Sequence, residues 1–316
     1  MALELSARQN TTNFTKVIHR TAQPATSPSR PELNQAGRTV LVTGGGTNIG
    51  FAIIKSFITA GVSTAIIAGR RKDVLDTAAA KLRAEIQEKG ASTTVLTYTL
   101  DQANPDSVRT LWAQLDSDGI VVDTLVLNAA AFSEEKPVVE LGAAKVWEAY
   151  EVNVRGPLEM VHSFASQKPT NRPRAIVNVA SQVINMLYES QLFIAAKRPV
   201  YGMTKNAGAM LMQQIAKDTN PEELQIVSFH PGILYSDEFQ RMGLSETDLP
   251  FDSADMPGSF AVWAATEEAR FLHGRFVWAS WDIEEYSQGE LRKRIDENVD
   301  FLRVGVVGLR GGLIDN

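Results

Sequence analysis

The stretch Thr43-Gly44-Gly45-Gly46-Thr47-Asn48-Ile49-Gly50 decides the fold that this sequence predicts. An apolar, β-branched run leads into it, and a segment with apolar residues at helical spacing follows directly. At the start of a helix, small residues let backbone amides approach a pyrophosphate, whose charge the helix dipole favours. A Gly-rich turn can also serve packing alone, but the strand-turn-helix context favours a dinucleotide phosphate site. The candidate residues of this site are Gly44, Gly46, Thr47, Asn48, Ile49 and Gly50.

Short β-branched runs alternate with helical segments along most of the chain, which predicts a parallel sheet covered on both faces. The predicted strands are Thr39–Thr43, Ser63–Ala68, Thr93–Tyr98, Thr124–Leu127, Ala175–Ala180, Leu224–Phe229 and Arg275–Trp278. We therefore predict a Rossmann-type, doubly wound α/β fold in a single domain at residues 38–280. Residues 1–37 are polar and rich in proline, so we expect them to form an arm on the surface. Residues 281–316 are predicted as a C-terminal extension with a helix at Gln288–Leu302.

Composition narrows the class of protein. The chain has 316 residues, 44% of them hydrophobic, which is enough for one large core. Its formal charge of -6 argues against nucleic acid as a partner. There is no cysteine, which excludes disulfides and thiolate ligands, and the scattered histidines predict no metal site. No apolar run approaches the roughly 20 residues that cross a bilayer, and the N-terminus lacks an apolar signal core. We expect no membrane association and a cytoplasmic location.

The second predicted strand ends in Ala68-Gly69-Arg70-Arg71, without the acidic residue that would accept hydrogen bonds from a ribose diol. The guanidinium of Arg70 suits a 2′-phosphate instead, so this strand end favours NADP(H) over NAD(H). Thr47 and Lys72 are candidate helpers. The alternative is that the two arginines are simply solvated.

A second set of residues carries acid–base chemistry. Tyr201-Gly202-Met203-Thr204-Lys205 places a phenol and an ammonium one helical turn apart on the same face. A phenol with a pKa near 10 is a poor catalyst at neutral pH, and a nearby cation favours its ionised form. Ser181 stands at the end of the fifth predicted strand, and Asn153 lies in the long helix before it. Each residue alone also has an ordinary explanation, as a strand end, a buried polar group or an exposed helix pair.

The glycine-rich turn and this set, in this order, resemble the short-chain dehydrogenase/reductase family, and flanking segments resemble a subgroup common among fungal enzymes. The resemblance implies that Tyr201 is the proton donor or acceptor, and that Lys205 tunes it and holds the nicotinamide ribose. It implies that Ser181 bonds the substrate oxygen and that Asn153 anchors a water. The implied activity is hydride transfer between NADP(H) and a carbonyl or alcohol.

The resemblance also implies further cofactor contacts. Asp101 would reach the adenine edge, although it could simply cap a turn. Asn128 and Ala129 would lie beneath the adenosine. The segment after the sixth predicted strand would hold the carboxamide, through Pro231, Gly232, Ile233 and Ser236.

The sequence departs from the family pattern at several positions. Asn48 replaces a glycine of the turn, but Asn tolerates a positive φ angle, so we expect the loop to keep its shape. Leu127-Asn128-Ala129-Ala130 stands where the family has N-N-A-G. The 20 positions between Ser181 and Tyr201 exceed the family's usual spacing and predict an insertion at Gln182–Val200.

Two apolar and aromatic segments suggest a hydrophobic small-molecule substrate, unless they cover the protein's own core. They are Met186–Phe193, within the insertion, and Leu234–Met256. The helices expected at Ala143–Ala165 and Tyr201–Lys217 resemble those of the family interface, which predicts a homodimer or homotetramer. Two other functions remain open: the same scaffold catalysing imine reduction or a cyclisation, and a non-catalytic protein that senses its cofactor.

Overall fold

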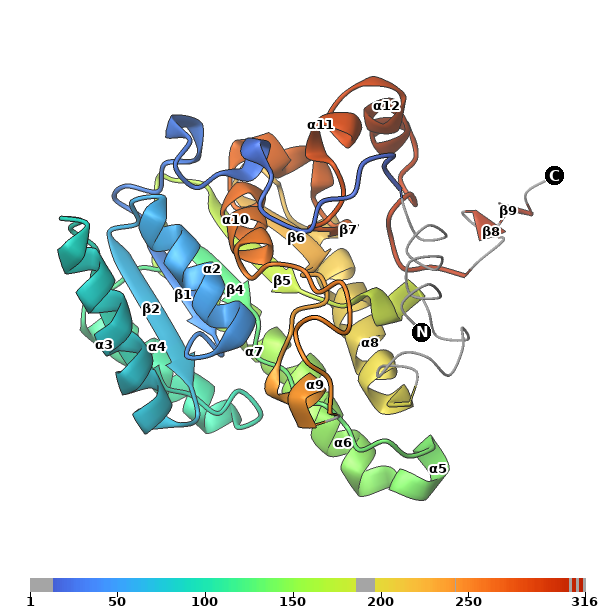
Figure 1. Cartoon of the computed structure of the whole chain (residues 1–316), viewed down its shortest axis with the longest axis horizontal. Helices are drawn as coiled ribbons and strands as arrows, with labels where there is room; N and C mark the ends of the chain where they lie inside the picture. The colour runs from blue at the N-terminus through green and yellow to red at the C-terminus, as the bar shows by residue number, and fades with distance from the viewer. Residues whose placement is uncertain (1–13, 186–196, 242, 307–308, 311–312, 315–316) are drawn as a thin grey trace.

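The structure is a computed structural model, which describes residues 14–185, 197–241, 243–306, 309–310 and 313–314. Within these residues seven parallel strands form one sheet in the order β3-β2-β1-β4-β5-β6-β7 (Figure 1). The strands are β1 Thr39–Thr43, β2 Thr64–Gly69, β3 Thr94–Thr99, β4 Thr124–Leu127, β5 Arg174–Val179, β6 Leu224–His230 and β7 Phe276–Trp278. The predicted Rossmann-type fold in a single domain is confirmed, and each predicted strand end lies within one residue of the observed one.

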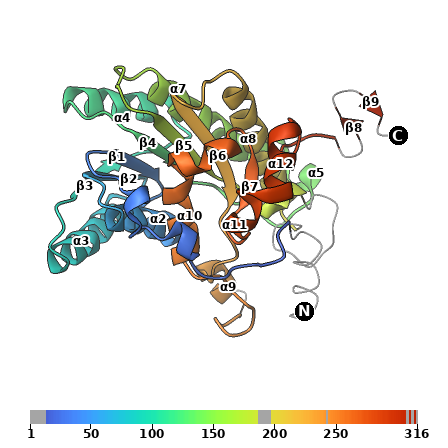
Figure 2. The same cartoon turned by 90° about the horizontal axis from the view of Figure 1, so that it is seen from above.

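Helices cover both faces of the sheet. Figure 2 shows α2, α3 and α10 on one face and α4, α7 and α8 on the other. The main helices of the described chain are α2 Asn48–Thr59, α3 Lys72–Glu88, α4 Pro105–Ser117, α6 Ala143–Tyr150, α7 Gly156–Ala165, α8 Pro199–Lys217, α10 Asp255–Ala264 and α12 Gly289–Glu297. Shorter elements are α5 Val138–Leu141, α9 Asp237–Arg241, α11 Ile283–Tyr286 and the paired strands β8 Leu309–Arg310 and β9 Leu313–Ile314.

The core follows from the alternation of side chains along each strand. Val40 and Val42 pack into the cluster beneath α2, α3 and α10, whereas Leu41, between them, packs into the cluster under α4, α7 and α8. A central parallel strand is buried on both faces, which explains why these runs are continuously apolar. The sheet thus fixes the positions of its strand ends, where the site lies.

Two predicted helices differ from the observed ones. The helix expected at Ala143–Ala165 is interrupted by a π-helical turn at Glu151–Arg155, between α6 and α7. The helix expected at Gln288–Leu302 ends at Glu297 instead, because Asn298 adopts an extended conformation with φ -106° and ψ 103°.

The N-terminal arm packs against the segment that follows β7. Ile18 pairs with Trp281 in an antiparallel bridge, and the His19 amide donates to the Ser280 carbonyl at 2.7 Å. The Phe14 ring lies 4.9 Å from the Trp281 ring, measured between centroids. Leu33 is fully buried, so the arm contributes to the core as well as crossing the surface.

Candidate active site

The glycine-rich turn has the backbone conformation that its sequence predicts. Gly44 has φ +67°, and a Cβ on Gly50 would lie 2.3 Å from the Gly44 carbonyl oxygen. Asn48 has φ +47°, so it occupies the left-handed region in place of the family glycine. The turn therefore needs glycine at Gly44 and Gly50, and Asn48 accommodates the missing one.

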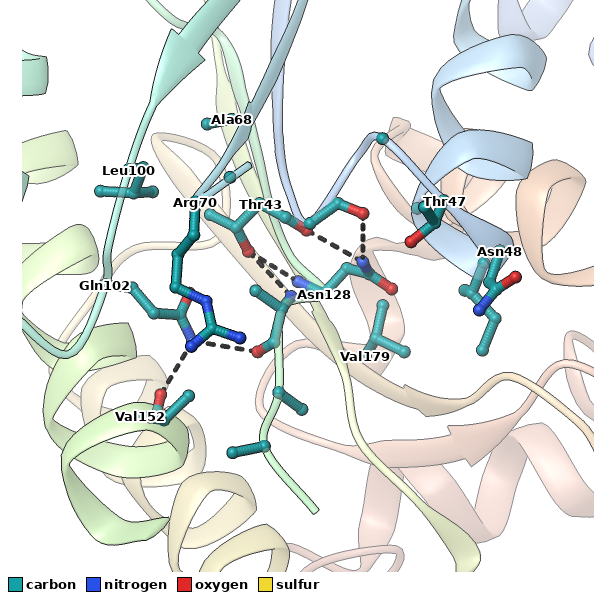
Figure 3. A pocket seen from close by; sticks show the side chains of 18 of the residues that line it. Thr43, Thr47, Asn48, Ala68, Arg70, Leu100, Gln102, Asn128, Val152 and Val179 are labelled. Carbon is teal, nitrogen blue, oxygen red and sulfur yellow. Dashed lines mark hydrogen bonds between the residues drawn. The ribbon is translucent and has the colours of Figure 1, made fainter. Parts of the chain in front are cut away.

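A cleft of about 340 Å³ opens at the carboxyl ends of the strands (Figure 3). It contains most of the predicted cofactor-binding residues, namely Gly44, Gly46, Thr47, Asn48, Ile49, Gly50, Arg70, Asp101, Asn128, Ala129, Tyr201, Lys205 and Pro231. Gly232, Ile233 and Ser236 follow Pro231 along the chain but do not line the cleft itself. In open α/β sheets this edge, where the strand order reverses, is where ligands bind.

One end of the cleft carries positive charge. Arg70 and Arg71 are exposed and line the cleft, and their guanidinium groups have no hydrogen-bond or ion-pair partner among the residues that the structure describes. Figure 3 shows the Arg70 side chain extending across the cleft from the end of β2. Lys72 does not line it, and its ammonium pairs with Asp76 at 2.5 Å. Arg71 is a lining residue that our sequence analysis did not single out, although it directly follows Arg70.

The floor of the cleft is fixed by side-chain amides. Asn128 donates from Nδ2 to the Thr43 carbonyl at 2.9 Å, tying the end of β4 to the end of β1 (Figure 3). Gln102 donates from Nε2 to the Ala129 carbonyl at 3.0 Å and to the Val152 carbonyl at 2.8 Å. No motif in the sequence indicates that Gln102 belongs to the site, and only its position directly after Asp101 relates the two.

Asp101 forms a turn at the end of β3. Its Oδ1 accepts a hydrogen bond from the Ala103 amide at 3.1 Å, while its own amide donates to Ser107 Oγ at 3.0 Å. The turn-capping alternative is thus observed. Because Asp101 also lines the cleft, the contact to an adenine edge stays a prediction.

Tyr201 and Lys205 lie on the first turns of α8, facing the end of β5. The Tyr201 side chain is buried, and the Ser181 hydroxyl lies close enough to act on the pKa of its phenol. Burial raises the pKa of Tyr201 to about 12, against the opposing effects of Ser181 and the charge of Arg198. The phenol is therefore protonated at neutral pH and can donate to a substrate oxygen.

The Lys205 ammonium donates to the Val179 carbonyl at 2.8 Å and lies 5.9 Å from the centroid of the Tyr201 ring. Burial lowers the pKa of Lys205 to about 8. Lys205 thus loses its charge at a lower pH than the one at which the phenol ionises. In the chain by itself, the positive charge that lowers the pKa of Tyr201 comes from Arg198.

Asn153 is buried in the π-helical turn between α6 and α7. Its Nδ2 donates to the Ala131 carbonyl and to Thr204 Oγ1, both at 2.9 Å, and its Oδ1 accepts from the Ala131 amide at 2.8 Å. π-Helical turns are frequent at functional sites, because they re-aim a side chain. Here the turn lets Asn153 hold the loop after β4 against α8, beneath Tyr201 and Lys205.

A stack of side chains covers the Tyr201 phenol. The Phe132 ring stacks on the Tyr201 ring with centroids 4.5 Å apart and an interplanar angle of 22°. The Arg198 guanidinium lies 5.7 Å from the Phe132 centroid and 3.4 Å from a Glu135 carboxylate oxygen. Phe132 is nevertheless 64% exposed and lines the cleft. Sequence reasoning missed Phe132 and Arg198, because neither belongs to a recognisable motif.

Within the described part of the chain, no group of three or more His, Asp or Glu side chains could hold a metal ion. None of the described helices is long and apolar enough to cross a membrane.

A doubly wound sheet with a glycine-rich turn into a helix, and a tyrosine, serine and lysine at the same edge, defines a class: the dinucleotide-dependent oxidoreductases. The family model of short chain dehydrogenases matches residues 38–246, and the chain belongs to the short-chain dehydrogenase/reductase family.

Fungal proteins are similar to this chain over nearly its whole length. A short chain dehydrogenase/reductase of Claviceps purpurea is 30% identical over 305 residues, covering 94% of this chain and 98% of that protein. AacuD of Aspergillus aculeatus, another short chain dehydrogenase/reductase, is 29% identical over 274 residues, covering 87% and 90%. The resemblance to fungal enzymes is thus confirmed.

Solved structures share the fold at lower identity. The Pseudomonas aeruginosa RhlG/NADP active-site complex has a TM-score of 0.66 at 19% identity, covering 79% of this chain and 97% of that one. L-sorbose reductase from Gluconobacter frateurii, complexed with NADPH and L-sorbose, has a TM-score of 0.67 at 20% identity, covering 78% and 96%.

Proposed function

We propose that the chain is an NADP(H)-dependent reductase or dehydrogenase that moves a hydride between nicotinamide and a carbonyl or alcohol carbon. The observation that carries the proposal is that Tyr201 and Lys205 line one end of a cleft whose other end carries Arg70, with Ser181 close enough to lower the pKa of the Tyr201 phenol. The glycine-rich turn lies between these two ends. This order matches the parts of a dinucleotide, with its pyrophosphate at the helix N-terminus.

The residues present fit such a cofactor. The turn offers a cradle that a side chain would fill, since a Cβ on Gly44 would approach Asn128 Nδ2 to 2.9 Å. Gln102 lines the cleft, and its buried Oε1 atom has no hydrogen-bond partner among the described residues. It is an acceptor that a ligand can use.

The preference for NADP(H) rests on the end of β2. Arg70 and Arg71 present guanidinium groups without carboxylate partners in the described chain, and guanidinium groups bind phosphate through paired hydrogen bonds. The known structures of RhlG and of L-sorbose reductase hold NADP or NADPH, which agrees with this choice.

When bound, the nicotinamide would supply or accept the hydride of the proposed reaction. Tyr201 donates its phenolic proton to the substrate oxygen during reduction, and Ser181 holds that oxygen in place by a hydrogen bond. Lys205 would hold the nicotinamide ribose, and Asn153 would anchor a water that links Lys205 to solvent. Proton transfer by a positioned side chain contributes about 10²- to 10⁴-fold to the rate.

We infer a hydrophobic substrate that lies against Phe132, because this ring is both exposed and part of the cleft wall. The aromatic side chains of the loop after β6 contribute less directly to the proposed substrate site. Phe251 contacts the rings of Tyr235 and Phe239, with centroids 5.3 and 4.8 Å apart, so these rings cover one another. Residues Met186–Phe193, the other predicted substrate segment, lie outside the described residues.

A screen of NADPH oxidation tests the proposed function. We expect turnover with apolar ketones at neutral pH. Turnover with imines but not ketones would favour the imine reductase, and substrate conversion without net NADPH oxidation would favour a cyclase. Tight NADPH binding without any turnover would favour a sensor.

We also propose that the protein forms a homodimer or homotetramer in the cytoplasm. Trp147 on α6 is 64% exposed and Leu158 on α7 is 45% exposed, which leaves apolar surface on the helices that form the family's interface. Light scattering at micromolar concentration tests this, and a monomer would contradict it.

A further inference from the structure

The loop after β6 is held by a carboxylate that lies outside the cleft. The Ile233 amide donates to Asp252 Oδ2 at 2.7 Å, and the Asp252 amide donates back to the Ile233 carbonyl at 2.8 Å. Gly232 permits this approach, because it has φ +95° and a Cβ there would lie 2.7 Å from Asp252 Oδ2. The loop is thus fixed directly after Pro231, which lines the cleft.

This finding bears on the prediction that Ile233 contributes to the carboxamide site. The Ile233 amide is already used by Asp252, so it can contact a cofactor only if that bond breaks. The bond instead fixes the backbone around it. The carboxylate therefore acts on the loop rather than on a ligand.

The other oxygen of Asp252 is bound by the N-terminal arm. Arg20 Nη1 donates to Asp252 Oδ1 at 3.3 Å and also to the Pro250 carbonyl, while the Arg20 carbonyl accepts from the Ser253 amide at 2.7 Å. The Asp252 side chain is only 5% exposed. Burial raises its pKa, against the opposing effects of the Ile233 amide and Arg20. A carboxylate this buried needs both partners to compensate its charge.

The arm is itself anchored on both sides of Arg20. His19 Nε2 lies 2.8 Å from Asp282 Oδ2, and Gln23 Nε2 donates to the Trp281 carbonyl at 2.8 Å. In Figure 1 the arm, in blue, runs past α10 towards α11 and α12. Arg20 is thus presented to Asp252 by a chain segment that is held in place independently.

We propose that Arg20 and Asp252 are positioning residues for the nicotinamide half of the cofactor, because together they fix the loop after β6 at the catalytic end of the cleft. The inference rests on the proposed function, which places nicotinamide at that end. A loop held in one conformation before binding avoids the entropy cost of ordering it when the ligand arrives. The N-terminal arm would then contribute to cofactor affinity without touching the cofactor.

The test compares two ligands, NADPH and 2′,5′-ADP, which carries the adenosine half and the 2′-phosphate but no nicotinamide. Asp252→Ala removes the carboxylate that binds the Ile233 amide and Arg20, and leaves the backbone bond from position 252 to the Ile233 carbonyl. We expect it to weaken NADPH binding by about tenfold, as expected for losing a charge-assisted hydrogen bond. Arg20→Met should act in the same direction, by a smaller factor. Both variants should bind 2′,5′-ADP within about twofold of wild type, a selectivity that a general loss of stability would not produce.

The matched control is Arg30→Met. Arg30 belongs to the same arm and pairs with Glu268 at 2.9 Å, but this pair does not contact the loop after β6. We expect both affinities to be retained in this variant. Adding Arg20→Met to Asp252→Ala should cause a smaller loss than Arg20→Met causes alone, because the contact between the two residues is already broken and only the bond from Arg20 to the Pro250 carbonyl is left to lose.

Unchanged or tighter NADPH binding in Asp252→Ala would overturn the inference, and so would an equal loss for both ligands. If Asp252→Ala does not fold, Arg20→Met decides in the same way, because the Arg20 side chain is 35% exposed. Wild-type protein that bound neither ligand would overturn the proposed function and this inference with it. Wild-type protein that bound both, with variants indistinguishable from it, would overturn the inference alone.

Discussion

The proposed cofactor half and the proposed substrate half of the site are built from different parts of the chain. The cofactor half uses strand ends and tight turns, where backbone groups and short side chains such as Thr43 and Asn128 hold one another. The substrate half uses long side chains from loops, such as Phe132 stacked between Tyr201 and Arg198. The first half is fixed by the sheet, whereas the second is fixed by side-chain contacts. Substitutions in the two halves should therefore fail in different ways.

The largest expected effect separates chemistry from binding. Tyr201→Phe removes the phenolic proton but keeps the ring that stacks on Phe132. We expect turnover to fall by about 10²-fold or more, the range for losing a general acid, while NADPH affinity stays nearly unchanged. Steady-state rates and a fluorescence titration of NADPH measure the two quantities. Substantial turnover in this variant would assign the proton to another donor.

The sequence predicted the strands and the backbone of the glycine-rich turn well because local rules determine them. A β-branched run, glycine at the turn and Asn48 at a positive φ angle can each be read from a few neighbouring residues. The contacts that were missed join residues far apart in the chain. Ile233 and Asp252 are 19 positions apart, and Arg20 and Asp252 are 232 positions apart. No periodicity or motif reports a pair at such a distance, so these contacts needed the structure.

A second prediction concerns the charged end of the cofactor half. Arg70→Asp removes the donors for a 2′-phosphate and offers an acceptor to a ribose diol, so the preference for NADPH over NADH should fall sharply or invert. A charge-assisted hydrogen bond contributes about 1.5 to 3 kcal/mol, so the affinity ratio should shift by at least roughly tenfold. Titrations of both reduced cofactors measure the ratio.

The matched control for Arg70 is Lys72→Met, because Lys72 pairs with Asp76 and does not line the cleft. The ratio should stay the same in this variant. Equal affinities in the wild type, or an unchanged ratio in Arg70→Asp, would show that Arg70 is surface charge only.

A third prediction addresses the substrate half through pH. In the proposed mechanism, alcohol oxidation requires ionised Tyr201. Burial raises the pKa of Tyr201 to about 12, although Ser181 and the charge of Arg198 oppose this increase. Arg198→Met removes that charge, so the pKa of the phenol rises. The increase of the oxidation rate with pH should then begin at higher pH, with a severalfold loss of rate at a given alkaline pH. Reduction at neutral pH should change less, because it uses the protonated phenol.

Two controls separate charge from packing at this position. Arg198→Lys keeps a positive charge, and the oxidation profile should stay close to that of the wild type. Glu135→Gln removes the carboxylate 3.4 Å from Arg198, which leaves the guanidinium charge less compensated. Its profile should stay in place or move to lower pH, the opposite direction from Arg198→Met. Lys205 and Ser181 also face the phenol and are unchanged in all three variants. Identical pH profiles of oxidation in the wild type and all three variants would show that the charge of Arg198 does not affect the pKa of Tyr201.

The smallest expected effect tests whether backbone conformation alone determines the turn of the cofactor half. Asn48 has φ +47°, a region that disfavours a residue with a plain Cβ by roughly 1 to 2 kcal/mol but that glycine adopts freely. Asn48→Ala should therefore lower the melting temperature by about 2 to 4 °C per kcal/mol lost, and Asn48→Gly should leave it nearly unchanged. Asn48→Gly should also keep its affinity for NADPH, because the glycine restores the family's turn without removing any backbone amide. Calorimetry with and without NADPH measures both quantities. Equal melting temperatures of the Ala and Gly variants would mean that the Asn48 side chain, rather than its backbone angle, determines how this position affects stability.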